Sequence, residues 1–251
     1  MRIRQATSDQ VFISLVIPAF NEEKLLPKTL AAIEKARTAF NPLGWSSEVI
    51  VCDNNSSDQT AAVARSAGAT VVFELVNQIG RARNTGAATA RGDWLVFIDA
   101  DSQPSVELFA EMARRIARGR VVAGGAAIEL DASAGWVRLL TAAWSCWSRV
   151  ARHMAGSFIF VETSAFRELG GFSEHLFAAE ELDLSQRLKK LAVQKHRTVE
   201  IISRPRLLTS ARKVQLYTPR EFCRFFFRAA LRPRRMLSDR EACHIWYDGR
   251  R

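Results

Sequence analysis

Two carboxylates two residues apart follow an apolar stretch of the sequence and could hold a metal ion. Asp99 and Asp101 flank Ala100 and come directly after the apolar run 94–98. On an extended segment that leaves a sheet, carboxylates at positions i and i+2 can meet at one hard divalent cation, such as Mn²⁺ or Mg²⁺. The alternative is a polar strand end in which Asp101 or Ser102 caps the following helix.

Two arginines near a predicted helix start could bind phosphate. Arg81 and Arg83 fall in the first turn of a helix predicted over 80–91. Free backbone N–H groups and fixed guanidinium charges at such a position suit a diphosphate, although the same arginines could form a solvated helix face. The glycine spacing matches neither a dinucleotide-binding loop nor a P-loop, which disfavours a nicotinamide enzyme.

The elements that must position these residues alternate regularly over the first hundred residues. Apolar patterns predict strands over 11–17, where Pro18 ends the strand, and over 48–52, 70–75 and 94–98; helices are predicted over 22–40, 59–67 and 80–91. This order predicts right-handed βαβ units and an open parallel sheet, with the ligand beyond the carboxyl ends of the strands. Polar residues occur at three of those ends: Asn21 and Glu22, Asp53 and Asn54, Asp99 and Asp101.

The second half of the chain loses this rhythm. Strands are predicted over 121–130, 157–161 and 198–202, and helices over 134–153 and 179–191. We therefore expect mixed strands and helices beside the first-half sheet.

Six segments, taken together and in order, resemble the motifs of family 2 glycosyltransferases with the GT-A fold. They are 17–23 (IPAFNEE), 51–60 (VCDNNSSDQT), 82–86 (ARNTG), 97–101 (FIDAD), 170–174 (GGFSE) and 180–187 (EELDLSQR). The segment 209–212 (TSAR) resembles a late motif of some members, and the resemblance covers about residues 11–213. It implies a GT-A-like α/β fold, with a Rossmann-type, mostly parallel central sheet flanked by helices and a mixed acceptor-side half.

The resemblance also implies a metal-dependent inverting enzyme that moves a sugar from a nucleoside-diphosphate donor, with UDP favoured, to an acceptor hydroxyl. Asp53 would bond the base, and Asp99 and Asp101 would hold Mn²⁺ or Mg²⁺ on the diphosphate. The residues assigned to the donor are Pro18, Ala19, Phe20, Glu22, Asp53, Arg83, Asp99, Ala100, Asp101 and Arg212. Those assigned to the acceptor side are Gly170, Gly171, Phe172 and Asp183.

Inverting transfer needs a carboxylate that takes the proton of the acceptor hydroxyl. Glu180 and Glu181 begin a predicted helix, whose dipole favours ionised carboxylates, and both remain candidates, with Glu181 preferred. The family usually has Asp at position 181, and the extra methylene of Glu shifts the carboxylate by about one bond length. Asp183 and Arg187 are four residues apart and can pair along the helix in a supporting role.

Composition limits the class of protein. The chain has 251 residues, of which 48% are hydrophobic and 25% charged, as in folded globular proteins. Its apolar runs fall short of the roughly 18 residues of a membrane-spanning helix, and the N-terminal apolar stretch is expected to be a strand rather than a cleaved signal. The four cysteines form neither a disulfide pattern nor a zinc pattern, so we expect a cytoplasmic protein.

The positive charge is concentrated at the C-terminal end. Residues 204–251 hold 13 Lys and Arg against 4 Asp and Glu, whereas the rest of the chain is nearly neutral. A basic amphipathic helix predicted over 218–235 could pack on its own domain or on a second subunit as a homodimer, or contact an anionic membrane on its inner face. No nucleic-acid-binding motif is present. Membrane contact would suit a lipid-linked acceptor, and a carbohydrate acceptor is the other expectation.

Three parts are therefore expected: a nucleotide-sugar-binding half (11–103), an acceptor-binding and catalytic half (104–213) and a basic tail (214–251). Two other classes remain open. A haloacid-dehalogenase-type phosphatase also uses an Asp-x-Asp, but places it after the first strand, whereas here it follows the fourth. A non-catalytic module would bind nucleotides or an anionic surface and leave the acidic cluster inert.

Overall fold

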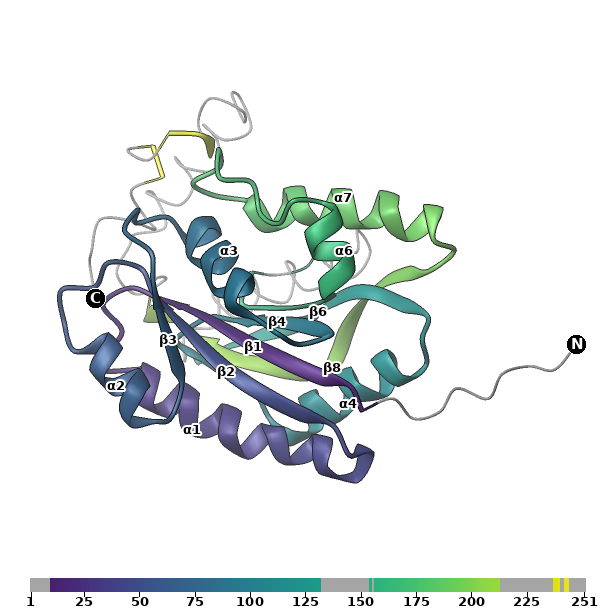
Figure 1. Cartoon of the computed structure of the whole chain (residues 1–251), viewed down its shortest axis with the longest axis horizontal. Helices are drawn as coiled ribbons and strands as arrows, with labels where there is room; N and C mark the ends of the chain where they lie inside the picture. Colours follow the sequence, from purple (N-terminus) through teal and green to yellow (C-terminus); the bar gives the residue numbers. More distant parts are fainter. Residues whose placement is uncertain (1–9, 132–153, 155, 213–236, 240–241, 244–251) are drawn as a thin grey trace, which may run out of the picture.

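The computed structural model describes residues 10–131, 154, 156–212, 237–239 and 242–243 (Figure 1). The helix predicted over 134–153 and the basic helix predicted over 218–235 lie outside the described residues.

One sheet runs through the described part of the chain, in the strand order β3-β2-β1-β4-β7-β6-β8-β5. The first four strands along the chain pair with one another in parallel. Strand β7 is antiparallel to β4 and β6, and β5 is antiparallel to β8. The predicted α/β fold with a mostly parallel first half and a mixed second half is confirmed. The strands are β1 (Phe12–Ala19), β2 (Ser46–Asp53), β3 (Thr70–Phe73), β4 (Trp94–Ile98), β5 (Ser102–Gln103), β6 (Val121–Asp131), β7 (Phe158–Glu162) and β8 (Thr198–Ser210).

Helices cover both faces of this sheet (Figure 1). On one face lie α1 (Leu26–Arg37), the 3₁₀ turn η1 (Thr38–Leu43), α2 (Thr60–Ser66) and α4 (Val106–Ala117). On the other lie α3 (Ile79–Thr89), α6 (Thr163–Glu168) and α7 (Glu180–Gln194). Each face buries its own apolar cluster, one around Leu15 and Phe109 and the other around Phe97 and Leu188. The sheet is therefore buried on both sides, as its nearly continuous apolar strands require.

Several predicted boundaries were wrong, and one helix was missed; β8, for example, continues to Ser210, past its predicted end at 202. Strand β1 continues through Pro18, because its pairing with β4 ends at Val16 and the missing N–H costs no ladder bond on that side. Helix α1 begins at Leu26, with a proline in its first two positions, and not at Glu22. Helix α4 was not predicted, and its cap is Ser105, whose side chain accepts a bond from the backbone N–H of Leu108.

Close packing between α3 and β1 fixes the helix that carries Arg83. A Cβ atom at Gly86 would lie 2.5 Å from Cγ1 of Val16, so only glycine permits this approach. The helix is buried along its small residues, and Arg83 belongs to the buried side.

Candidate functional site

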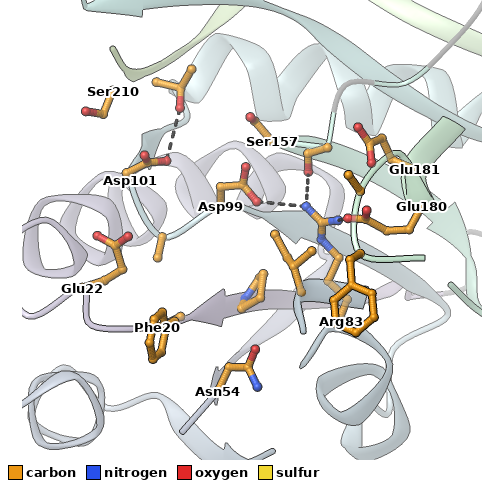
Figure 2. Close-up of a pocket in the computed structure, with 18 of the residues that line it drawn as sticks. Phe20, Glu22, Asn54, Arg83, Asp99, Asp101, Ser157, Glu180, Glu181 and Ser210 are labelled. Atoms are coloured by element: carbon orange, nitrogen blue, oxygen red, sulfur yellow. Dashed lines mark hydrogen bonds and ion pairs between the residues drawn. The ribbon is translucent and has the colours of Figure 1, made fainter. Parts of the chain in front are cut away.

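A pocket of about 300 Å³ opens at the carboxyl ends of β1 and β4 (Figure 2). Ten of its lining residues are residues that the sequence assigned to donor binding or catalysis: Pro18, Ala19, Phe20, Glu22, Arg83, Asp99, Ala100, Asp101, Glu180 and Glu181. They come together because parallel strands end at the same edge of the sheet, and because α7 begins across that edge.

Arg83 joins three elements beneath this pocket. Its Nη1 donates to Oε1 of Glu180 at 2.7 Å, and its Nη2 donates to Oδ1 of Asp99 and to the backbone oxygen of Gly156, both at 3.0 Å (Figure 2). Arg83 is 1% exposed and Glu180 3%. The guanidinium therefore ties the end of β4 to the start of α7, and its two Nη groups donate to protein oxygens.

This cluster holds three carboxylates around one guanidinium. Burial lowers the pKa of Arg83, but the charges of Asp99, Glu180 and Glu181 outweigh burial and raise it, so Arg83 stays charged. Glu181 is half-buried, and no hydrogen bond from Arg83 to it is found, unlike Glu180. Burial and the neighbouring Glu180 carboxylate raise the pKa of Glu181 to about 8, against the opposing effect of Arg83. Glu181 can thus exchange a proton near neutral pH.

Replacing Arg83 with Met is expected to lower the free energy of unfolding by about 3–5 kcal/mol, because it leaves a buried carboxylate without its partner. Urea denaturation at pH 7 measures the loss. Arg114→Met is the matched control, since Arg114 forms an exposed pair with Glu111 and should lose no more than about 1 kcal/mol. Equal losses in the two variants would show that the buried cluster adds nothing to stability.

A second ion pair closes the other side of the pocket. The two carboxylate oxygens of Glu22 accept bonds from Nη1 and Nη2 of Arg212, at 3.0 and 2.6 Å. Nη2 of Arg212 also lies 3.9 Å from Oδ2 of Asp101, and Oγ1 of Thr209 donates to Oδ1 of Asp101 at 3.3 Å. Burial lowers the pKa of Arg212, but Glu22 and Asp101 raise it overall. Arg212, two residues after β8, thus lies beside Asp101 and Glu22.

The donor set near Asp99 and Asp101 fits a hard cation that is shared with a substrate. Both residues line the pocket and offer carboxylate oxygens, the ligands that Mg²⁺ and Mn²⁺ prefer. In the described part of the chain, no group of three or more His, Cys, Asp or Glu side chains is arranged so that it could hold a metal ion. A cation held by two carboxylates completes its shell with water and phosphate oxygens, so these residues fit a metal that binds together with a diphosphate.

Six of the assigned residues, among them Arg212, lie outside the lining of this pocket. Asp53 is buried, and its Oδ1 accepts a bond from the backbone N–H of Ser56, while its neighbour Asn54 lines the pocket. Gly171, Phe172 and Asp183 contribute to contacts with α3 and α7 instead, and Gly170 precedes them in the chain. Arg187 pairs with Asp183 and donates to the backbone oxygen of Gly171. Gly171 has φ +73°, and a Cβ atom at this position would clash with Asn84.

The sequence did not assign twelve other lining residues. They are Asn54, Asn77, Ile79, Ile128, Leu130, Gly156, Ser157, Phe177, Ala178, Ala179, Thr209 and Ser210. Asn54, Thr209 and Ser210 stood inside recognised motifs, which was a usable signal. Ile128 and Leu130 belong to the apolar pattern of β6, and that pattern does not distinguish a pocket wall from a core.

Residues 14–169 match the family model described as "Glycosyl transferase family 2", which is more than half of the chain. A dolichyl-phosphate beta-glucosyltransferase of Trichomonas vaginalis is 34% identical over 110 residues, covering 40% of this chain and 33% of the relative. An undecaprenyl-phosphate 4-deoxy-4-formamido-L-arabinose transferase of Pseudomonas aeruginosa is 34% identical over 133 residues, covering 50% of this chain and 38% of the relative. The matches thus span about a third of these curated relatives.

Solved structures share the fold at low sequence identity. TarS of S. aureus in complex with UDP-GlcNAc has a TM-score of 0.61 and 19% identity, covering 93% of this chain and 69% of TarS. Glucosyl-3-phosphoglycerate synthase of Mycobacterium tuberculosis, in complex with Mn²⁺, UDP and phosphoglyceric acid, has a TM-score of 0.58 and 18% identity, covering 88% and 76%. The predicted GT-A-like fold is confirmed. None of the described helices is both long enough and apolar enough to cross a membrane.

Proposed function

Because the chain belongs to glycosyl transferase family 2, we propose that it transfers a sugar, with inversion, from a nucleoside-diphosphate donor to an acceptor hydroxyl. UDP is the favoured nucleotide. The observation that carries the proposal is the convergence of Asp99, Asp101 and Glu181 on one pocket at the carboxyl ends of β1 and β4. The nucleotide and the metal-bound diphosphate would each lie along one wall of this pocket, and the carboxylate that acts as base would belong to another wall.

The donor would lie along the end of β1. Pro18, Ala19 and Phe20 form an apolar wall there, and Asn54 lies beside it. Binding energy from the base and ribose would then hold the anomeric carbon in place. TarS and glucosyl-3-phosphoglycerate synthase, which share the fold, were both solved with uridine nucleotides, and this supports UDP as the donor nucleotide.

Glu181 would act as the general base. In a single displacement its carboxylate takes the proton of the acceptor hydroxyl, the hydroxyl oxygen bonds to the anomeric carbon, and the bond from that carbon to the diphosphate breaks. The proton ends on Glu181, and the negative charge leaves with the nucleoside diphosphate. Glu180, held by Arg83, would fix the first turn of α7 so that Glu181 faces the pocket.

Asp99 and Asp101 would hold the divalent cation, Mn²⁺ or Mg²⁺, which when bound stabilises negative charge on the departing diphosphate. Arg212, beside Asp101, would add a fixed positive charge at the same edge. Among the structures with this fold, glucosyl-3-phosphoglycerate synthase was solved with Mn²⁺.

The acceptor is proposed to be a carbohydrate or a lipid-linked molecule, since two relatives are named for dolichyl phosphate and undecaprenyl phosphate. Contact with an anionic membrane through 218–235, dimerisation and a cytoplasmic location stay predictions, as does the division at residues 103 and 213. Leu237, farther along the tail, contacts the catalytic half: its backbone oxygen accepts a bond from the N–H of Phe177.

The phosphatase and the non-catalytic module have no support among the comparisons. Asp99 follows β4, which is flanked by β1 and β7 in the interior of the sheet, and not the first strand of the chain. The two acidic residues also share their pocket with Glu181, which a module with an inert acidic cluster would not require.

The test is a thermal-shift screen of nucleotide-sugars with and without Mn²⁺. At about 100 times its dissociation constant, a true donor stabilises the fold by about 2.7 kcal/mol, which corresponds to about 5–10 °C for a chain of this size. We expect a UDP-sugar to give such a shift only when Mn²⁺ is present. A shift of similar size with Mn²⁺ alone, or none with any nucleotide, would contradict the proposal.

A further inference from the structure

The loop that precedes α7 is central to the pocket but has little structure of its own. We call residues 173–179 the acceptor-side loop. Phe177, Ala178 and Ala179 line the pocket, and the loop leads directly into Glu180 and Glu181. Ala179 has φ +62°, a left-handed conformation that costs a non-glycine residue energy. Contacts from outside the loop must therefore hold it in place.

Gln78, the residue before α3, supplies two of those contacts. Its Nε2 donates to the backbone oxygen of Glu174 at 2.9 Å and to that of Leu176 at 2.8 Å. Gln78 is 2% exposed, so the donor of both bonds is buried. One amide nitrogen thus satisfies two loop carbonyls two residues apart, and it fixes the curvature of the loop between them.

Gln78 is itself held against the donor side of the pocket. Its backbone N–H donates to Oδ1 of Asn54 at 2.9 Å, and Nδ2 of Asn54 donates to the backbone oxygens of Glu74 and Val76 at 3.2 and 2.7 Å. Gln78 precedes α3 in an extended conformation, with φ −154° and ψ 123°. The acceptor-side loop is therefore positioned relative to the end of β2, where the donor wall begins.

Other described contacts lie just before the loop, at the side chain of Glu174 and at the backbone of Phe177. Asn84 bonds both backbone groups of Phe172, just before the loop begins. Arg81 pairs with the side chain of Glu174 where both side chains are partly exposed, a type of pair that contributes little. The N–H of Phe177 donates to Leu237. Among these described contacts, those of Gln78 alone reach the backbone at 174 and 176 from a buried position.

We propose that Gln78 is a positioning residue that sets the acceptor-side loop, and with it the acceptor wall and the approach of Glu181 to the acceptor hydroxyl. The step to catalysis rests on the proposed function, whereas the step to loop position does not. Loss of the amide would remove the side-chain donor that the backbone oxygens of residues 174 and 176 share, and displacement of the base by an ångström has a large effect on rate.

Two substitutions separate hydrogen bonding from shape. Gln78→Met keeps the length of the side chain but has no donor, and Gln78→Glu places a carboxylate oxygen against two carbonyl oxygens. Gln194→Glu is the matched control, because Gln194 is exposed at the end of α7. Hydrogen exchange followed by mass spectrometry should show peptides covering 174–179 exchanging about tenfold faster in both Gln78 variants and unchanged in the control.

Exchange in β4 reports whether the whole fold has opened, and Gln78→Met serves if the Glu variant does not fold. With β4 still protected, unchanged exchange at 174–179 would overturn the inference.

Two further measurements complete the test. Calorimetry measures the binding of UDP in the presence of Mn²⁺. An activity assay measures UDP release from the donor found in the thermal-shift screen, with water as acceptor. We expect affinity for UDP to change by less than about threefold, and kcat for UDP release to fall about tenfold. An equal loss of UDP affinity and kcat would assign Gln78 a general structural role instead. If the unmodified protein binds no nucleotide, the proposed function fails, while the exchange result still decides the role of Gln78 in loop position.

Discussion

Replacing Glu181 with Gln is expected to lower UDP release from the donor sugar by about 10²–10⁴-fold, which is the usual contribution of a general base. The amide has nearly the same shape but cannot accept the proton of the attacking hydroxyl at neutral pH. Affinity for UDP and Mn²⁺ should stay within about threefold, because Glu181 lies on the acceptor side of the pocket, away from the proposed donor wall. Stopped-assay kinetics and calorimetry measure the two quantities.

The pH dependence makes this prediction specific to Glu181. Its pKa is raised to about 8, so kcat/KM of the unmodified protein should rise about tenfold per pH unit below 8 and level off above it. The Gln variant should lack this limb. Because the pKa is raised on folding, ionisation opposes folding, and stability is lost as the pH rises from about 4.5 to about 8. The variant escapes that loss, so its Tm at pH 8 should be no lower.

Two further variants decide the assignment. Glu168→Gln, an exposed Glu on α6 that pairs with Lys195, should leave the rate and its pH profile unchanged. If Glu180→Gln removes the limb near pH 8 and Glu181→Gln keeps it, the base is Glu180 and our assignment is wrong.

The part of the site that the sequence predicted well follows from strand direction. Asp99 and Asp101 follow β4, Pro18 and Ala19 end β1, and the two strands are parallel neighbours. Parallel neighbours bring such ends together whatever the side chains are, so the pattern of apolar runs was enough to place them at one edge. The family motifs added the start of α7, which no periodicity would have placed across that edge.

The rotation of α3 was harder to predict. Arg81 and Arg83 both looked like diphosphate ligands, yet Arg83 is buried under the pocket and Arg81 pairs with Glu174 outside it. Two positions apart on a helix point in nearly opposite directions, so only one of them could face the site. The signal was the set of small residues Gly80, Gly86 and Ala87, which share the buried side with Arg83. Their small size permits the close approach to β1 that turns Arg83 inward.

Helix α4 was missed although its pattern was present. Leu108, Phe109, Met112, Ala113 and Ile116 recur at helical spacing after Ser105, and all five are buried. The acceptor-side loop, which Gln78 holds, is the opposite case, because no pattern in the sequence indicated its contacts. Its hydrogen bonds join residues almost a hundred positions apart, and a lone glutamine before a helix carries no local mark of that partnership. Contacts of this kind depend on how the halves of the sheet meet, which the sequence pattern does not encode.

Replacing Asp101 with Asn is expected to abolish the dependence of UDP binding on Mn²⁺. Asn keeps the shape of the side chain and can still accept the bond from Thr209, so the fold should persist. It lacks the negative charge that a hard divalent cation requires of a site with only two carboxylates. Asp99 would remain, but its Oδ1 already accepts a bond from Arg83, so it alone offers a weaker ligand.

Calorimetric titration of UDP with and without Mn²⁺ tests this expectation. In the unmodified protein the metal should increase affinity at least about tenfold, and in the Asn variant the two titrations should coincide. Asp93→Asn is the matched control, since Asp93 is exposed before β4, at the end opposite Asp99, where its Oδ2 accepts a bond from the N–H of Phe12. That variant should keep the full metal effect. If Asp101→Asn also keeps it, the cation is held elsewhere and the departing diphosphate must be stabilised by Arg212 and the backbone instead.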